Sequence, residues 1–284
     1  MSERRSFVIE SRAGRVLHGT VDLPEERAAR PVVVCAHGFK GFQEWGFFPY
    51  LGELLAERGF VVVRFNFSGS GMQPGEELVS DLEAFRTNTV AQELAEIEDV
   101  LAALAPRVAP GRVDLDRLAL FGHSRGGAIA LLTAARTDLP FEVRALVTWA
   151  AISRFDRIPA EHVEAWRRSG ALPILNLRTG QRLEVGLDLL RDVEGNREAY
   201  DLLAAAARRR MPWLIVHGTQ DDTVPHDEGI ELERAARNPR QVVIVEGGDH
   251  GLGGRHPFPG PRPPLVQALN ATQSFLRREL AAVR

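Results

Sequence analysis

Residues 118–127 constrain the fold of this 284-residue chain more than any other stretch. The first four are apolar, as expected for a strand buried on both faces. Gly122, Ser124 and Gly126 follow at alternate positions, and an apolar segment with helical character comes next. Side chains at the two glycines would collide with the neighbouring strand and helix, so the pattern predicts a tight strand–turn–helix unit. The turn would lift the Ser124 hydroxyl clear of the sheet, at a helix N-terminus whose dipole favours negative charge.

Around this unit the chain alternates between apolar runs typical of strands and patterns typical of helices. The predicted strands are 7–10, 16–21, 32–36, 60–65, 117–121, 145–150, 213–217 and 242–245. The predicted helices of this part are 48–58, 87–105, 227–237 and 267–281. The alternation predicts an α/β fold, a mostly parallel sheet of about eight strands with helices on both faces. Ligands of such sheets bind at the carboxyl ends of the strands.

One long segment, residues 152–210, interrupts this alternation. It has helical patterns at 159–169 and 197–210 and a hairpin pattern at 174–183, but no buried strand followed by a helix. We interpret it as a lid inserted into the fold, called the cap below. The predicted core then consists of residues 1–151 and 211–284. Residues 72–86, before the second long helix, are polar and are predicted to be irregular.

Composition excludes several classes of function. The formal net charge is −3, which disfavours nucleic acid as a partner. The single cysteine, Cys35, lies in an apolar run and is interpreted as a small buried hydrophobic residue. No apolar run is long enough to cross a membrane, and the N-terminal residues lack the apolar region of a secretory signal. We therefore expect a cytoplasmic protein with no membrane partner.

Residues with catalytic chemistry follow three of the predicted strands. Ser124 follows 117–121, Asp221 follows 213–217, and His250 follows 242–245. The carboxyl ends of parallel strands share one edge of the sheet, so the three side chains are predicted to meet there. The order serine, acid, histidine along the chain is that of the α/β-hydrolases.

The motifs in these loops give the chain a resemblance to that superfamily. They are His37-Gly-Phe-Lys-Gly41, Gly122-His-Ser-Arg-Gly-Gly127 and His217-Gly-Thr-Gln-Asp221-Asp-Thr-Val-Pro225. Within the superfamily the chain resembles bacterial cinnamoyl or feruloyl esterases and the related dienelactone hydrolase and serine aminopeptidase groups. The resemblance implies an α/β-hydrolase fold and a serine hydrolase that cleaves carboxylic esters through an acyl-enzyme intermediate, without a cofactor.

The candidate residues have distinct roles in this chemistry. A serine hydroxyl needs an adjacent base, so His250 would accept the proton of Ser124 and pass it to the leaving group. Asp221 would hold the imidazole tautomer and stabilise the imidazolium. Two backbone N–H groups must bind the oxyanion. The residue after the nucleophile, Arg125, supplies one, and the resemblance places the other at Phe39.

Several nearby residues are alternatives. Asp222 adjoins Asp221, but the acid of the family is the fifth residue of the motif that begins at His217. His226 lies beside the proposed acid and His256 lies in a proline-rich loop, so His250 is preferred to both. The histidines do not group at metal-ligand spacing, so no metal site is predicted.

Other polar residues are given structural interpretations. His37 and His217, at the ends of buried strands, are expected to satisfy backbone hydrogen bonds, and His123 is expected to pack. The Arg125 side chain could bind a substrate carboxylate, but pairing with a nearby acid is favoured. The acidic residues Glu93, Glu96, Glu98 and Asp99 are interpreted as a solvated helix face rather than a metal site.

The substrate is left open by the sequence. Apolar residues that could line a pocket for an acyl or aromatic group, or simply pack in the core, are Trp45, Phe47, Phe48, Phe67, Trp166, Leu172 and Leu175. The alternatives to an esterase are a peptidase or amidase, an acyltransferase, and a non-catalytic binding protein. A peptidase would need charged groups in the cap, for which Glu161, Glu164 and Glu184 are candidates. The expected partner is a small-molecule ester, and a homodimer is left open.

Overall fold

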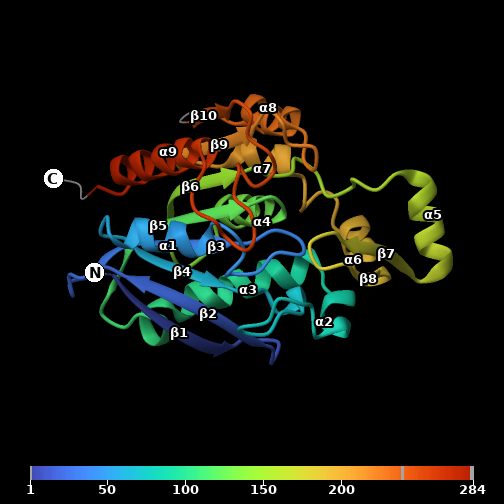
Figure 1. The fold of residues 1–284 in the computed structure, drawn as a ribbon, viewed down its shortest axis with the longest axis horizontal. Coiled ribbons are helices and arrows are strands. Elements are labelled where there is room, and N and C mark those ends of the chain that lie inside the picture. The colour runs from blue at the N-terminus through green and yellow to red at the C-terminus, as the bar shows by residue number, and fades with distance from the viewer. Residues whose placement is uncertain (1, 238–239, 282–284) are drawn as a thin grey trace.

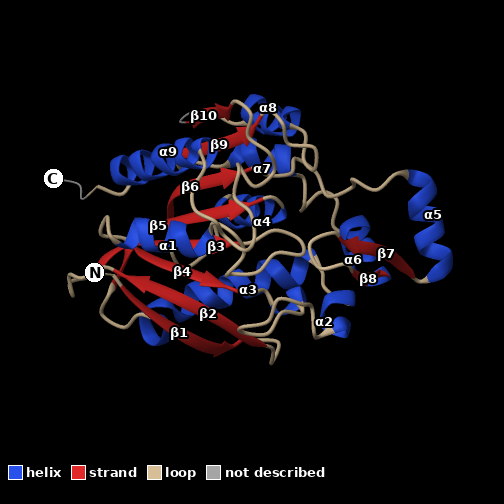
Figure 2. Cartoon of the chain, viewed as in Figure 1, coloured by secondary structure: helices blue, strands red, loops and turns tan. Residues whose placement is uncertain are grey.

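Eight strands form one sheet in the order β1-β2-β4-β3-β5-β6-β9-β10 (Figures 1 and 2). The computed structural model describes residues 2–237 and 240–281, so the predicted core boundaries at 1 and 284 lie outside it. Strand β2 is antiparallel to both of its neighbours, and the pairs from β4 through to β10 are parallel. The bounds are β1 (Glu3–Glu10), β2 (Val16–Leu23), β3 (Arg30–Ala36), β4 (Val61–Phe65), β5 (Val113–His123), β6 (Val143–Trp149), β9 (Trp213–Gly218) and β10 (Arg240–Val245). The predicted mostly parallel sheet is confirmed.

Helices cover both faces of the sheet because alternate residues of each strand point to opposite sides. In β3, Val32 and Val34 belong to one apolar cluster, whereas Val33 and Cys35 belong to the other. The first cluster packs under α3 (Val90–Ala103), α4 (Arg125–Ala134), α7 (Leu202–Arg208) and α8 (His226–Ala235). The second packs under α1 (Phe48–Ala56) and α9 (Pro263–Glu279). Burial of Cys35 raises the pKa of its thiol to about 12, consistent with a packing role.

The segment 152–210 contains α5 (Ala160–Ser169), a two-stranded sheet of β7 (Ala171–Asn176) and β8 (Gln181–Gly186), then α6 (Leu187–Gly195) and α7. Figure 1 shows α5, β7, β8 and α6 gathered at one end of the molecule. Trp166, Leu183 and Val185 of this segment pack in a third apolar cluster with Phe42 and Phe85 of the core. The segment therefore contacts the core through apolar side chains.

The predicted element boundaries differ from the structure in several places. Residues 72–86, predicted to be irregular, contain α2 (Leu82–Arg86), which Asp81 caps by accepting the Ala84 N–H. Helix α6 was not predicted, and the helix predicted at 197–210 begins only at Leu202. A 3₁₀ turn, η1 (Ser68–Ser70), and a π turn, η2 (Leu104–Val108), complete the described elements. Among the described residues, no helix is long and apolar enough to cross a membrane.

Candidate active site

The turn between β5 and α4 has the strained geometry that its sequence predicts. Ser124 has φ 57° and ψ −125°, a conformation that non-glycine residues rarely adopt. A Cβ at Gly122 would lie 2.2 Å from the Gly126 carbonyl oxygen, and one at Gly126 would lie 2.3 Å from the Ala36 carbonyl oxygen. Both glycines are therefore required for α4 to approach β5 and β3 this closely. The serine lies directly before the first residue of α4, where backbone N–H groups have no partner within the helix.

Asp221 and His250, from the loops after β9 and β10, are hydrogen-bonded. The His250 Nδ1–H donates to Asp221 Oδ2 at 2.8 Å. The other carboxylate oxygen accepts the N–H groups of Thr223 at 3.0 Å and Val224 at 2.8 Å. Burial acts to raise the pKa of Asp221, but hydrogen bonds from His217 and His250 outweigh it and hold this pKa well below its ordinary value. The acid is thus an oriented anion at neutral pH.

His123, the residue before Ser124, connects the serine loop to the loop of His250. The His123 Nε2–H donates to the His250 carbonyl oxygen at 2.8 Å, and the two imidazole centroids are 4.7 Å apart. Within the part of the chain that is described, Ser124 Oγ itself makes no hydrogen bond, to His250 or to any other group. Such bonds are often long or poorly aligned in a free enzyme and tighten when substrate binds.

The loop after β3 lies directly against the serine. A Cβ at Gly38 would lie 2.9 Å from Ser124 Cβ, so only glycine fits without displacement. The preceding residue anchors this loop: the His37 Nδ1–H donates to the Gly38 carbonyl at 2.9 Å, and Nε2 accepts the Phe67 N–H at 3.1 Å. Burial lowers the pKa of His37 to about 4, so the ring is neutral at pH 7. The expected structural role of His37 is confirmed.

The Arg125 side chain pairs with an acid, as favoured by the sequence. Its Nε–H donates to Glu93 Oε2 at 2.8 Å. Both residues are buried, with exposures of 7% and 5%. The interpretation of Glu93 and Glu96 as part of a solvated helix face is therefore wrong: Glu96 is also buried, against Ser68 and Gln92.

The other candidate residues have different surroundings. Asp222 is exposed and accepts the hydroxyl of its neighbour Thr223, and His226 begins α8 beside Asp227. His256 accepts the Gly46 N–H and contacts Glu77. His217 donates to the Val224 carbonyl oxygen at 2.8 Å, and its Nε2 lies 3.4 Å from Asp221. The expected backbone bond of His217 is confirmed, whereas its contact with the acid was not predicted.

Two features of this site were not predicted, and only the first of them has a local signal in the sequence. Glu93 lies between Val90 and Ile97 at the spacing of the apolar helix stripe, and a charge on that stripe requires a buried partner. Gly38 belongs to the quoted motif, but its contact with Ser124 depends on how two distant loops meet. That proximity has no local signal.

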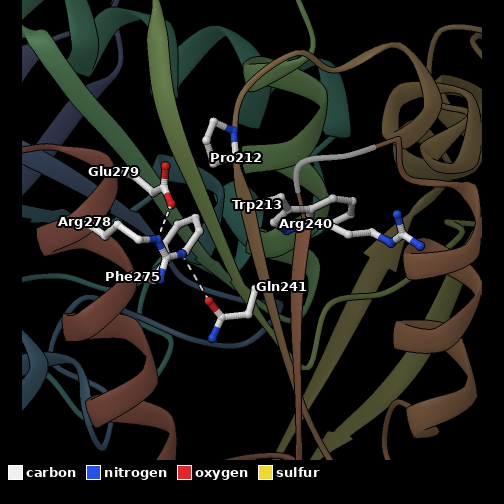
Figure 3. Close-up of a pocket in the computed structure, with 7 residues that line it drawn as sticks. All are labelled: Pro212, Trp213, Arg240, Gln241, Phe275, Arg278 and Glu279. Atoms are coloured by element: carbon white, nitrogen blue, oxygen red, sulfur yellow. Dashed lines mark hydrogen bonds and ion pairs between the residues drawn. The ribbon is translucent and has the colours of Figure 1, made fainter.

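A cavity of about 270 Å³ lies elsewhere, between α9 and the amino ends of β9 and β10 (Figure 3). One of its two arginines, Arg278, donates to Glu279 and Gln241 in the wall of the cavity itself. Trp213, at the start of β9, marks the edge of the sheet opposite the serine. This cavity is therefore remote from the residues discussed above. Among the described residues, no three His, Cys, Asp or Glu side chains are grouped as a metal ion would require.

Comparison with known families assigns the class of the protein. The fold and the loops described above define an α/β-hydrolase, and the profile of the alpha/beta hydrolase family matches residues 33–260. The chain belongs to this family. The uncharacterized protein YfhR of Escherichia coli (strain K12) is 23% identical over 196 residues, covering 69% of this chain and 55% of YfhR. Cutinase est2 of Thermobifida alba is 30% identical over 122 residues, covering 43% of this chain and 36% of the cutinase. The chain thus spans about half or less of these relatives.

Solved structures share the fold. Est1E from Butyrivibrio proteoclasticus has a TM-score of 0.68 at 19% identity, covering 97% of this chain and 99% of Est1E. The esterase domain of a Rhodothermus marinus protein has a TM-score of 0.67 at 20% identity, covering 98% and 100%. The acylaminoacyl peptidase of Pyrococcus horikoshii has a TM-score of 0.70 at 19% identity, covering all of this chain and 42% of the peptidase. This chain therefore shares its fold with proteins described as an esterase domain and as a peptidase.

Proposed function

We propose that this protein is a serine hydrolase that cleaves carboxylic esters through an acyl-enzyme intermediate. Ser124 attacks the ester carbonyl, His250 takes the serine proton and returns it to the leaving alcohol, and Asp221 orients the imidazole. Water then attacks the acyl-enzyme with His250 again acting as the base. The reaction requires no cofactor.

The observation that carries this proposal is the hydrogen bond from His250 Nδ1 to Asp221, at 2.8 Å. It fixes the tautomer in which Nδ1 carries the proton and Nε2 has a lone pair for the serine hydroxyl. Because the Asp221 pKa lies well below its ordinary value, the carboxylate remains an anion that stabilises the imidazolium. The strained turn at Ser124 supports the assignment, since such strain is concentrated at functional sites.

The backbone N–H groups of Phe39 and Arg125 are the proposed oxyanion donors. Arg125 is the first residue of α4, so its N–H has no intrahelical acceptor. Gly38 brings the loop of Phe39 against the serine. Removing one such donor costs about 3–4 kcal/mol of transition-state stabilisation in known enzymes.

An ester with an apolar acyl group is favoured over a peptide with a charged terminus. The cap meets the core through apolar residues, among them Trp166 and Leu183. The acids considered for a peptide terminus are exposed, and two of them face arginines: Glu164 lies 3.7 Å from Arg167, and Glu184 lies 3.7 Å from Arg86. We also propose that residues 152–210 act as a lid, and that the extent of water exclusion beneath it decides between hydrolysis and acyl transfer.

A panel of p-nitrophenyl esters of increasing acyl length tests this proposal, with an aminoacyl arylamide included. We expect turnover of the esters, and its loss in Ser124→Ala with unchanged folding by circular dichroism. Ser68→Ala is the matched control, because Ser68 contacts a buried carboxylate, Glu96, but lies after a different strand. Ester turnover that survives Ser124→Ala, or that is lost only in Ser68→Ala, would refute the assignment.

A further inference from the structure

The side chain of Arg125 connects the two halves of the proposed oxyanion site. The backbone N–H of this residue is one proposed donor, at the start of α4. The guanidinium carbon lies 5.8 Å from the centroid of the Phe39 ring, and the Phe39 N–H is the other proposed donor. The Arg125 side chain therefore extends from one proposed donor residue to the ring of the other, Phe39.

Glu93 determines where this guanidinium lies. The Nε–Oε2 distance is 2.8 Å, and the two side chains are 9% and 6% exposed. A buried charge without a partner is costly, so each group holds the other in place. The second Glu93 oxygen accepts the Asn88 Nδ2–H at 2.7 Å. Asn88 packs closely against Gly69, because a Cβ added at Gly69 would lie 2.1 Å from Asn88 Oδ1. The chain of contacts leaves the guanidinium little freedom.

The guanidinium is one of several groups that contact the Phe39 loop. The loop makes a tight turn, with Lys40 at φ 60° and the Gly41 N–H donating to the Gly38 carbonyl at 2.9 Å. The Phe39 ring also contacts Phe85, at a centroid distance of 5.5 Å. A guanidinium over an aromatic ring is attracted by the negative face of the ring, and the attraction is stronger where water is excluded. This attraction favours the loop position seen here.

We propose that the buried pair of Arg125 and Glu93 is a positioning device that sets the distance between the two oxyanion donors. The pair acts through the Phe39 ring and the start of α4 and does not touch the reacting atoms. The inference rests on the proposed function, since it assigns a purpose to the two donors named there. One guanidinium nitrogen, Nη2, is buried without a hydrogen-bond partner among the described residues, so a substrate contact is the competing explanation.

The test compares two double variants with the wild type. Arg125→Met with Glu93→Leu removes both charges together, which avoids leaving one of them buried alone. Arg64→Met with Asp22→Leu is the control: this pair is 2.9 Å apart and is even more buried, but it lies between β4 and β2 under α1. Phe39→Leu tests the ring contact separately. For each protein, kcat and KM are measured with p-nitrophenyl butyrate. The concentration of active sites is determined by titration with a fluorophosphonate. Ki is measured for a trifluoromethyl ketone of the same acyl length, because its adduct with the serine carries the oxyanion.

We expect kcat to fall about 10- to 100-fold in the first double variant, since small displacements of catalytic groups have effects of this size. KM should change far less, and Ki of the ketone should rise in parallel with the loss of kcat/KM. The control should lose thermal stability at unchanged kcat. Unchanged kcat and Ki in the first variant would overturn the proposal, as would a rise in KM alone, which would assign Nη2 to substrate binding. Absence of both turnover and labelling in the wild type would instead refute the proposed function, and this inference with it.

Discussion

Replacing Gly38 with alanine should slow turnover without unfolding the protein. The new methyl carbon would lie 2.9 Å from Ser124 Cβ, 3.1 Å from the His123 carbonyl oxygen and 3.4 Å from Ser124 Oγ. Non-bonded carbon atoms pack at about 3.5–4.0 Å, so the loop or the serine must move by roughly 0.6 Å or more. Either movement changes the distance between the nucleophile and the proposed Phe39 donor.

The size of the effect follows from this displacement. A misplacement of about 1 Å can cost about 100-fold in rate, and complete loss of one oxyanion donor costs about 100- to 1000-fold. We therefore expect kcat for p-nitrophenyl butyrate to fall about 10- to 100-fold. KM should change less, because the displaced groups stabilise the transition state and not the bound ester. Overpacking of this kind typically costs about 1–3 kcal/mol of stability, which a folded protein of this size can tolerate.

The assay measures kcat, KM and Tm of Gly38→Ala beside Gly195→Ala. Gly195 lies at the end of α6, where an added Cβ meets nothing within 4 Å, so this control should match the wild type. Normal folding together with wild-type kcat in Gly38→Ala would show that close packing of this loop does not constrain the position of the serine.

Three further outcomes are expected. Gly126→Ala should be more damaging to the fold than Gly38→Ala, because its Cβ would lie 2.3 Å from the Ala36 carbonyl oxygen; a Tm within a degree of the wild type would contradict this. Stability should fall between pH 7 and pH 5, because burial lowers the pKa of His37 to about 4 and of His123 to about 3, so that unfolding takes up protons below pH 6.5. Each histidine should contribute about 2 kcal/mol to this loss, measured by urea unfolding, and His123→Gln should reduce the slope. Asp221→Asn should lower kcat by about 10⁴-fold at pH 7 with the fold retained, as loss of the orienting carboxylate does in related chemistry; near-normal kcat would remove Asp221 from the mechanism.

The main features of the fold could be predicted because they have strong local signals. Residues 118–121, directly before Gly122, are all apolar, as a strand buried on both faces requires, and the two glycines leave room only for a tight turn. The order of Ser124, Asp221 and His250 then places them at one edge of a parallel sheet. Asp221 and His250, which come from separate loops, are hydrogen-bonded to each other, as expected for an acid and a histidine in this order.

The remaining features depend on contacts between distant segments. Helix α6 has only nine residues, and its apolar side chains other than Leu190 are only partly buried, in contact with the apolar clusters of the core. The burial of Glu93 is compensated by Arg125, which belongs to another helix, and no local pattern identifies that partner. Strand β1 begins at Glu3 because its backbone pairs with β2, although its first residues are polar.

Mapping the site of covalent labelling tests the central claim most directly. The intact protein is treated with a fluorophosphonate, and the modified peptide is identified by mass spectrometry in the wild type, in Ser124→Ala and in Asp221→Asn. The account predicts one adduct per chain, on Ser124, absent from the first variant and formed much more slowly in the second. An adduct on another serine, or labelling of Ser124 at the same rate without the Asp221 carboxylate, would contradict it.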